Sequence, residues 1–373
     1  MHTPSRPPNF NLTREWPFAL LAAVVAAMTL GSGAVTWIMS HPAGVVALLI
    51  TLCGLILLGS IALVRHADVL AHRLGEPGGT LLLTLAVTGL EAAMVGLVMS
   101  SGEEKPALAR DTMYAVVMLV LNGYLGVALV LGGWRHREQP YNPQSANAFL
   151  VMIVPFCVLT LVLPNFTKAS EGPTLTAFQM GFLSACSVAI YAVFLLVQNR
   201  WHRDFFVHND RPHGHAESPD RSGAPTWLHI VMLALYGAAI ILIAKKISKP
   251  LDALIAKVGA PEALAGFIMA MLVLTPESIA AVKAASRNQL QRCVNILLGS
   301  VLASIGLTVP IVVVVALTTG RHLVLGLGPV QMVMLVLTLA VTILTFARTK
   351  THLLLGGVHL LLFVGSLVLV FDR

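Results

Sequence analysis

The sequence predicts an all-α polytopic membrane protein. Hydrophobic residues make up 57% of the chain and charged residues only 11%, whereas soluble domains carry about 25% charged residues. The mean hydropathy is +0.83. The apolar residues form continuous runs near the ~20 residues that a helix needs to cross a bilayer. They lack the alternation of polar and apolar residues that is typical of membrane barrels.

The apolar runs predict about 11 transmembrane helices. The first run follows a polar start, and it is too long and too poorly provided with a cleavage site to be a removable signal peptide. It is therefore expected to remain as a helix of the protein. The expected spans are 17–39, 44–64, 79–100, 112–132, 147–165, 177–198, 227–248, 262–284, 291–316, 327–347 and 352–370.

One long polar segment, NRWHRDFFVHNDRPHGHAESPDRSGAPTW, divides the chain nearly in half. With the first span taken as one extra helix, five spans precede this segment and five follow it. An odd number of helices per unit gives the two units opposite orientations, which is the inverted-repeat plan of many secondary transporters. The expected parts are a tail and extra helix (1–40), a first five-helix repeat (41–198), a linker (199–226) and a second repeat (227–373).

The distribution of positive charge predicts the orientation in the membrane. The formal net charge is +7, and most Lys and Arg fall in loops on the side of the N-terminus. The positive-inside rule therefore favours a cytoplasmic N-terminus and a cytoplasmic 199–226 linker in a bacterial inner membrane. Basic loops beside membrane lipid explain the charge, and no nucleic acid partner is expected. Association into a homo-oligomer is left open.

Two glutamates in the middle of apolar runs predict the functional site. Glu91 lies in TLAVTGLEAAMVGLVMS and Glu277 in AGFIMAMLVLTPESIAAV. A carboxylate at mid-membrane depth costs roughly 2.5 to 3.5 kcal/mol on insertion scales, so such residues usually face a protein-lined or watery interior and have a function. One glutamate in each half suggests a shared site.

The residues around the glutamates suit a hard cation. Pro276 precedes Glu277, and a proline inside a helix frees the carbonyl four residues earlier. Calcium takes six to eight oxygen ligands, so two carboxylates would need hydroxyls, amides, carbonyls or water beside them. Any one of these polar residues is more often a hydrogen-bonding group between helices than a ligand. The candidate neutral ligands are Thr88, Asn122, Thr275, Asn295, Ser300 and Ser304.

The remaining polar residues are interpreted as structural or solvated rather than as parts of the site. The four cysteines lie within predicted spans without a CxxC spacing, so they are expected to be apolar fillers. The histidines of the 199–226 linker have the setting of a solvated segment, with a pH or metal sensor as the alternative. His359 in the last span is interpreted as a packed histidine rather than a proton relay.

Three strings carry a resemblance to a known family. They are TGLEAAMVGLVMSSGEEKPALARDTMYAVVMLVLNGYLG, LVLGGWRHREQPYNPQSANAF and LTPESIAAVKAASRNQLQRCVNILLGSVLASIGLTVP. They resemble the ChaA-type calcium (sodium, potassium)/proton antiporters of the Ca²⁺:cation antiporter (CaCA/CAX) superfamily, over most of residues 79–310. The resemblance implies one extra helix, two inverted five-helix repeats, and a cation and proton site built around one acidic residue per repeat.

Residue by residue, the resemblance assigns Glu91 to the first repeat, Glu277 to the second, and the family's Gly-Ser step to Gly299-Ser300. Vacuolar-type relatives have a Gly-Asn-x-x-Glu pattern in both repeats. Here Thr88 and Leu274 stand at the position of the asparagine. Calcium is the favoured substrate, and sodium or potassium remains an alternative.

The expected mechanism is competition at the paired carboxylates. Two nearby carboxylates in a low dielectric hold protons when the site is empty and lose them when a cation arrives. A Ca²⁺ ion neutralises two carboxylates as two protons do. The expectation is therefore antiport of Ca²⁺, Na⁺ or K⁺ against H⁺, with Glu91 and Glu277 as the metal ligands and no resident cofactor.

Three alternatives accompany this hypothesis. The first is a monovalent-only Na⁺(K⁺)/H⁺ antiporter and the second a cation channel, although an inverted repeat with a mid-helix proline favours a transporter. The third is an intramembrane enzyme. No GxSG string and no pair of aspartates within spans is present, so the chain is not expected to be an enzyme.

Overall fold

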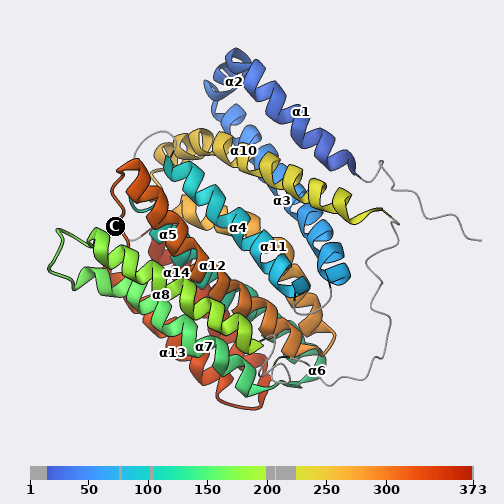
Figure 1. The fold of residues 1–373 in the computed structure, drawn as a ribbon, viewed down its shortest axis with the longest axis vertical. Helices are drawn as coiled ribbons and strands as arrows, with labels where there is room; N and C mark the ends of the chain where they lie inside the picture. The colour runs from blue at the N-terminus through green and yellow to red at the C-terminus, as the bar shows by residue number, and fades with distance from the viewer. Residues whose placement is uncertain (1–14, 75–77, 101–104, 199–205, 207–223, 372–373) are drawn as a thin grey trace, which may run out of the picture. The chain divides into compact units, whose positions relative to one another are not determined.

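A computed structural model describes residues 15–74, 78–100, 105–198, 206 and 224–371 (Figure 1). The chain forms two compact units, unit 1 with residues 1–86 and 209–250, and unit 2 with residues 87–208 and 251–373. The α-helices are α1 Trp16–Leu30, α2 Ser32–Met39, α3 Pro42–Leu74, α4 Gly78–Ser100, α5 Leu108–Val117, α6 Leu125–His136, α7 Pro143–Cys157, α8 Ala177–Leu196, α10 Thr226–Val258, α11 Ala263–Ser286, α12 Leu290–Thr319, α13 Pro329–Phe346 and α14 Leu353–Val370.

The all-α membrane fold predicted from the sequence is confirmed. Within the described residues, 9 helical stretches are long and apolar enough to cross a membrane. The prediction of one continuous helix over 17–39 is not confirmed. This segment breaks at Gly31, and its two helices meet at 92°. Gly31 has no Cβ, and a Cβ there would lie 2.7 Å from the carbonyl oxygen of Ala27, so glycine permits the turn.

Two helices are much longer than the spans predicted for them. α3 and α10 have 33 residues each, which corresponds to about 50 Å of helix, against predicted spans 44–64 and 227–248. The added turns carry charged side chains, which end an apolar run without ending a helix. α10 also continues through Pro250, and after it Asp252 receives both hydrogen bonds of Lys105, at 2.6 and 2.5 Å.

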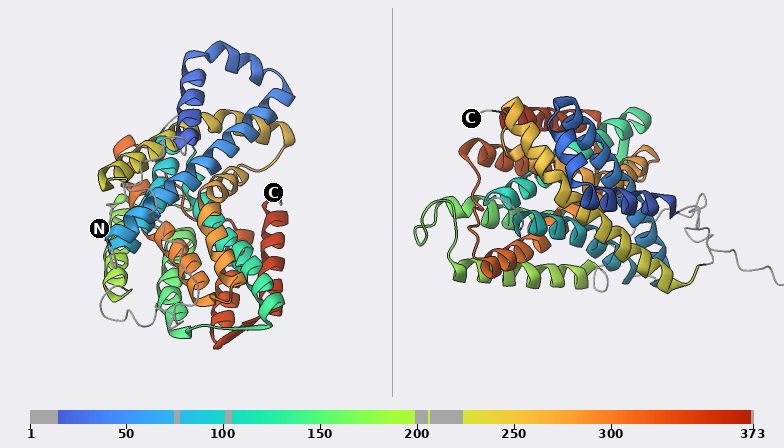
Figure 2. Two further views of the ribbon diagram at one scale, coloured as in Figure 1. Left: turned by 90° about the vertical axis from the view of Figure 1, so that its right-hand side faces the viewer. Right: turned by 90° about the horizontal axis from the view of Figure 1, so that it is seen from above.

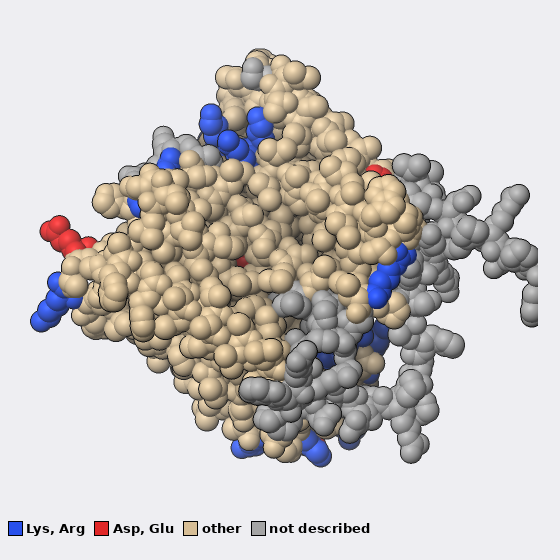
Figure 3. Space-filling model, viewed as in Figure 1, with Lys and Arg blue, Asp and Glu red and all other residues tan. Residues whose placement is uncertain are grey.

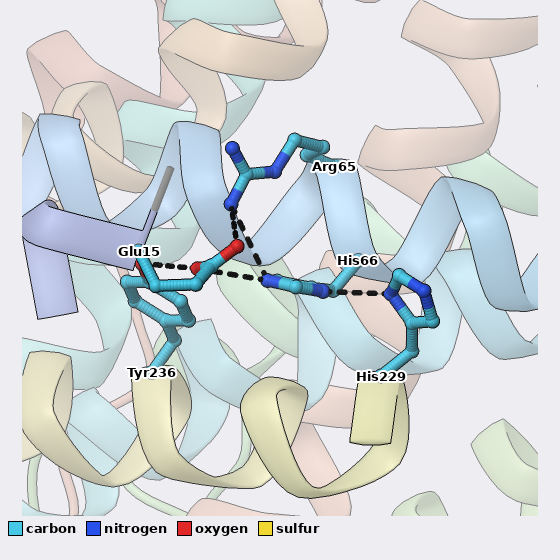
Figure 4. A network of polar contacts seen from close by, with 5 residues as sticks. All are labelled: Glu15, Arg65, His66, His229 and Tyr236. Atoms are coloured by element: carbon cyan, nitrogen blue, oxygen red, sulfur yellow. Dashed lines mark hydrogen bonds and ion pairs between the residues drawn. The ribbon is translucent and has the colours of Figure 1, made fainter. Parts of the chain in front are cut away.

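Unit 1 contains a buried polar network that joins α1, α3 and α10 (Figure 4). Glu15, directly before α1, accepts hydrogen bonds from Arg65 at 2.7 Å and from Tyr236 at 2.8 Å. Its Oε2 atom lies 3.2 Å from Nε2 of His66. The Nδ1 atoms of His66 and His229 are 2.9 Å apart. All these side chains except Arg65 are buried, so the network satisfies polar groups that water does not reach.

Unit 2 is built around α12 and the helical stretch from α5 to α6. α12 packs against α7, α8 and α11, and α5 packs against α11 (Figures 1 and 2). In the stretch Leu108–His136, 78% of the apolar window is buried, whereas in α8 and α14 only 22% is buried. The stretch Leu108–His136 therefore forms the core of this unit. α8 and α14 present large apolar side chains outward, as lipid contact requires.

The backbones of α6 and α14 touch along a seam of glycines. A Cβ at Gly133 would lie 2.6 Å from the backbone nitrogen of Leu353, and a Cβ at Gly356 would lie 2.6 Å from that of Val130. Such contacts are typical of membrane helices, which associate by van der Waals packing at small residues because lipid provides no hydrophobic drive. The seam fixes α14 against the core.

A short two-stranded sheet, which the sequence did not predict, joins the loops that follow α6 and α13. β1 (Glu138–Pro140) pairs antiparallel with β2 (Lys350–His352). Lys350 donates to Glu138 at 2.9 Å and holds the pKa of that carboxyl below its usual range. The Tyr141 hydroxyl donates to the carbonyl of Arg348, and burial raises the pKa of Tyr141 to about 12.

Charged side chains are scarce on the described part of the face drawn in Figure 3. On the face drawn in Figure 3, most of the visible surface carries neither Lys or Arg nor Asp or Glu. Exposed large apolar residues include Val151, Phe178 and Leu361, which are 72%, 83% and 70% exposed. A surface of this composition belongs in lipid, so the chain is a multi-pass membrane protein.

The glycine seam predicts a matched pair of substitutions. Gly356→Ala puts a methyl group against the backbone of α6, and we expect a loss of about 1 to 3 kcal/mol in unfolding free energy. Gly357→Ala, one residue later, meets nothing within 4 Å and is expected to be neutral. Thermal unfolding in detergent measures both. Equal melting temperatures for the two variants would contradict the seam.

The network of unit 1 predicts a second stability difference. Glu15→Ala leaves Tyr236 and His66, which are buried, without their shared acceptor, and a buried donor left without a partner costs about 1 to 3 kcal/mol. The lost ion pair with Arg65 adds less, because that side chain is 41% exposed. We therefore expect a clearly lower unfolding temperature. Tryptophan fluorescence measures it, since Trp16 is the residue after Glu15.

The control for Glu15→Ala is Glu138→Ala. It removes an ion pair whose side chains are 59% and 60% exposed, and such pairs contribute little. If both alanine variants unfold at the wild-type temperature, the buried network does not stabilise unit 1.

Candidate cation site

The first predicted glutamate lies in α4 against the middle of α12. Glu91 is 2% exposed. Its Oε2 atom accepts a hydrogen bond of 2.6 Å from the hydroxyl of Ser304. Its Oε1 atom is buried and has no hydrogen-bonding partner within the described part of the chain. A buried carboxylate oxygen without a partner is costly, so the position suits a bound proton or cation.

The second predicted glutamate lies in α11 and reaches the same face of α12. Oε2 of Glu277 accepts a hydrogen bond of 3.3 Å from the hydroxyl of Ser300. Glu277 is less buried than Glu91. The two carboxylates therefore differ in their access to the surroundings.

Two serines of α12 bring the glutamates to neighbouring positions. Ser300 and Ser304 are four residues apart, so they lie one above the other on one face of the helix, with Cα atoms about 6 Å apart. Each hydroxyl donates to a different carboxylate. Four of the eight predicted site residues, Glu91, Glu277, Ser300 and Ser304, are thus linked in two pairs on adjacent turns.

Two more predicted residues flank the glutamates along their own helices. Thr88 is buried one turn before Glu91 in α4. Thr275 precedes Pro276 and Glu277 in α11. The Thr275 hydroxyl donates to the carbonyl of Met271 at 2.5 Å and lies 2.9 Å from the Tyr124 hydroxyl. Thr275 thus ties α11 to the core stretch of unit 2.

The structure pairs Asn122 with residues other than the glutamates. Its Nδ2 atom donates to the Thr338 hydroxyl at 2.8 Å, and its Oδ1 atom lies 3.1 Å from Nδ1 of His359. The other ring nitrogen of His359 lies 3.0 Å from the Thr345 hydroxyl. Asn122 therefore links the core to α13 and α14, and His359 is packed with both nitrogens paired, as the sequence suggested.

Asn295 is likewise engaged away from the carboxylates. Its Oδ1 atom accepts from Ser145 at 2.9 Å and from Gln291 at 2.8 Å, and its Nδ2 atom donates to the carbonyl of Phe206 at 2.7 Å. The two amides predicted as ligands thus join helices, which is the more common role of such residues in membrane helices.

Sequence reasoning missed a change of helix type beside Asn122. Residues Met118–Tyr124 form a π-helical stretch between α5 and α6. A second such stretch, Val158–Val162, follows Pro155 of α7. Short π-helical insertions are rare and frequently occur at functional sites. Pro155 was a signal for the second one, whereas nothing in MLVLNGY indicated the first.

The donor set fits a cation carried as cargo. Among the described residues, no group of three or more His, Cys, Asp and Glu could hold a metal ion. The oxygens present are two carboxylates and neighbouring hydroxyls, which are hard ligands of the type that Ca²⁺ prefers. Hydroxyls rotate easily, so Ser300 and Ser304 can donate to an empty carboxylate and offer lone pairs to a bound cation.

A helical membrane fold in which a buried and a half-buried glutamate bond to serines on adjacent turns of one helix is typical of membrane proteins that bind ions. Comparisons give its family. Residues 44–199 and 228–371 match the sodium/calcium exchanger protein family. The chain therefore belongs to the sodium/calcium exchanger family.

Relatives and solved structures agree with this assignment. The chain is 41% identical over 364 residues to the putative ionic transporter y4hA of Sinorhizobium fredii, with 95% of each sequence covered. It is 38% identical over 321 residues to the sodium-potassium/proton antiporter ChaA of Escherichia coli, covering 85% of this chain and 86% of that one. The native structure of YfkE has the same fold, with a TM-score of 0.73 at 18% identity, covering 96% of this chain and all of that one.

Ser304 gives a direct test of this geometry. Ser304→Ala removes the donor to Glu91, and hydrogen bonds to charged groups contribute about 1.5 to 3 kcal/mol. We therefore expect cation exchange at subsaturating cation to fall about tenfold or more. Ion flux into proteoliposomes measures this.

The control is Ser184→Ala in α8, where the hydroxyl bonds to the carbonyl of Met180 in its own helix. Its exchange rate is expected to be that of the wild type. A Ser304→Ala variant that exchanges as fast as Ser184→Ala would contradict a role for the Ser304 hydroxyl.

Proposed function

We propose that this protein is a secondary transporter that exchanges a cation for protons by competition at Glu91 and Glu277. The observation that carries the proposal is the pair of hydrogen bonds from Ser304 and Ser300 to these two carboxylates. Ca²⁺ is the favoured cation, with Na⁺ or K⁺ as the alternative. Thr88 and Thr275 supply further hydroxyls on the same helices.

Charge balance explains how one site serves both ions. Two carboxylates carry two negative charges when ionised. Two protons or one Ca²⁺ ion neutralise them equally, so either occupant removes the cost of buried charge. An empty, ionised site is the costly state, and exchange follows because that state is avoided while the site changes sides. A single Na⁺ or K⁺ leaves one charge, which one proton can neutralise.

The names of two relatives support cation and proton exchange. ChaA is a sodium-potassium/proton antiporter, and a plant relative, 24% identical, is vacuolar cation/proton exchanger 1 of Arabidopsis thaliana. The first name supports the monovalent alternative, so the cation is the part of the proposal that most needs measurement. The division into two inverted repeats and the bacterial inner membrane belong to the same proposal. So do a cytoplasmic N-terminus and a cytoplasmic 199–226 linker, although residues 1–14 and most of that linker lie outside the described residues.

The test uses everted membrane vesicles in which respiration has built a pH gradient. Ca²⁺, Na⁺ or K⁺ is added in turn to wild type, Glu91→Gln, Glu277→Gln and the control Glu171→Gln, which changes a loop glutamate on the surface. Glutamine keeps the shape but does not exchange a proton. We expect a cation to collapse the gradient in wild type and control, and neither glutamine variant to retain more than about 1% of that rate.

Each outcome has a definite meaning. The cation that collapses the gradient in wild type is the substrate, and a response to Na⁺ or K⁺ alone selects the monovalent alternative. If the glutamine variants respond like wild type, the carboxylates are not the exchange site. A cation current without proton movement in reconstituted membranes would instead identify a channel.

A further inference from the structure

A row of hydroxyl side chains runs along α12 beyond the two serines. Ser300, Ser304 and Thr308 follow one another at intervals of four residues, so they lie on one face with about 6 Å between steps. Ser300 donates to Glu277 and Ser304 to Glu91. The third member, Thr308, continues the row.

The spacing along α12 places Thr308 on the face that meets α4. Ser304 bonds to Glu91 at one end of this helix pair. At the other end, a Cβ on Gly96 would lie 3.4 Å from Val315 and 3.8 Å from Ile311. The spacing of residues 304, 308, 311 and 315 keeps them on one helix face. Thr308 therefore lies between these two points of approach, on the side of Glu91 that leads towards Gly96.

The hydroxyl of Thr308 is buried without a partner. Thr308 is 0% exposed, and its Oγ1 atom has no hydrogen-bonding partner among the described residues. A threonine in a helix can bond the carbonyl four residues earlier, as Thr112 and Thr342 do here at 2.8 and 2.7 Å. Thr308 does not make this bond, so its hydroxyl is left for another group.

A second unpartnered oxygen lies between the same two helices. Oε1 of Glu91 is also buried, and it too has no partner in the described part of the chain. Ser304, which bonds the other oxygen of Glu91, is one helical turn from Thr308. Buried polar atoms without partners are few in folded proteins, and each needs an explanation. Here two such atoms lie between the same pair of helices, and one ligand held between these helices would explain both.

We propose that Thr308 is a third ligand-bearing residue of the cation site, which extends from Glu91 towards Gly96. The cation lies between Oε1 of Glu91 and Oγ1 of Thr308 and contacts the hydroxyl directly or through one water. This inference rests on the proposed cation exchange and adds a residue that determines affinity. A neutral hydroxyl adds an oxygen without adding charge, so it strengthens cation binding without taking up a proton.

The test compares three substitutions on α12. Thr308→Val keeps the shape and removes the hydroxyl, and Thr308→Ser keeps the hydroxyl. Thr318→Val is the control, because the Thr318 hydroxyl bonds the carbonyl of Val314 in its own helix. For each variant, Ca²⁺, Na⁺ and K⁺ are titrated in proteoliposome exchange and in thermal unfolding of the purified protein.

We expect Thr308→Val to raise the half-saturating cation concentration about tenfold in both measurements, as the loss of one ligand interaction of about 1.4 kcal/mol would. Thr308→Ser and Thr318→Val are expected to match wild type. Without cation, Thr308→Val is expected to unfold at or above the wild-type temperature, because it removes a buried polar group that has no partner. A purely structural hydroxyl would predict a lower temperature.

The outcomes separate this inference from the proposed function. Unchanged half-saturation in Thr308→Val, with exchange still lost in Glu91→Gln and Glu277→Gln, overturns the role of Thr308 and leaves the function intact. If a cation stabilises the wild type and Thr308→Val weakens this effect, Thr308 is supported as a ligand of the cation. If the same protein moves no protons, proton exchange is overturned. Absence of any cation-dependent stabilisation in wild type overturns the ligand role.

Discussion

The structure of unit 2 depends on how two carboxylates are kept inside an apolar helix bundle. Each glutamate receives a hydroxyl from α12, Glu91 from Ser304 and Glu277 from Ser300. Hydrogen bonds to charged groups are among the stronger ones in proteins, yet one such bond does not offset the loss of water around a carboxylate. The arrangement therefore holds both groups on adjacent turns of α12 and leaves Oε1 of Glu91 without a hydrogen-bonding partner among the described residues.

The helices around these carboxylates are closely packed. The stretch from α5 to α6 is deeply buried, and its backbone meets α14 at glycines rather than through long side chains. The amides of Asn122 and Asn295 join helices at fixed positions. Polar groups that bind an exchangeable ion need neighbours that do not rearrange to satisfy them, and close backbone packing supplies such neighbours.

The sequence was most informative where burial in lipid imposes a single answer. Apolar runs predicted the spans because a membrane helix has a fixed length, and the glutamates stood out because charge at that depth is expensive. The family assignment followed from strings around those glutamates and is confirmed by the match over residues 44–199 and 228–371. The pairing of Ser300 and Ser304 with the two glutamates lay within the predicted set.

Sequence was uninformative where the partner of a polar group is distant along the chain. Asn122 lies beside His359, which is 237 residues away along the chain, and the residues around Asn122 do not indicate this pairing. The break at Gly31 and the π-helical stretch at Met118–Tyr124 depend on backbone packing rather than on apolar length. The sequence also did not predict the unpartnered hydroxyl of Thr308, because a threonine in a membrane helix normally bonds its own backbone.

The hydrogen bonds from His229 through His66 to Glu15 in unit 1 run in one direction, from donor to acceptor. The carboxylate of Glu15 accepts from Arg65 and Tyr236. Nε2 of His66 lies 3.2 Å from this carboxylate and 3.4 Å from Nη2 of Arg65, and the shorter contact is made when Nε2 carries a proton and donates to Glu15. In a neutral His66 the Nδ1 atom must then be the acceptor, and the facing Nδ1 of His229 must be the donor. Both rings are thereby held in opposite tautomers, and the chain of donors runs from α10 through α3 to the residue that precedes α1.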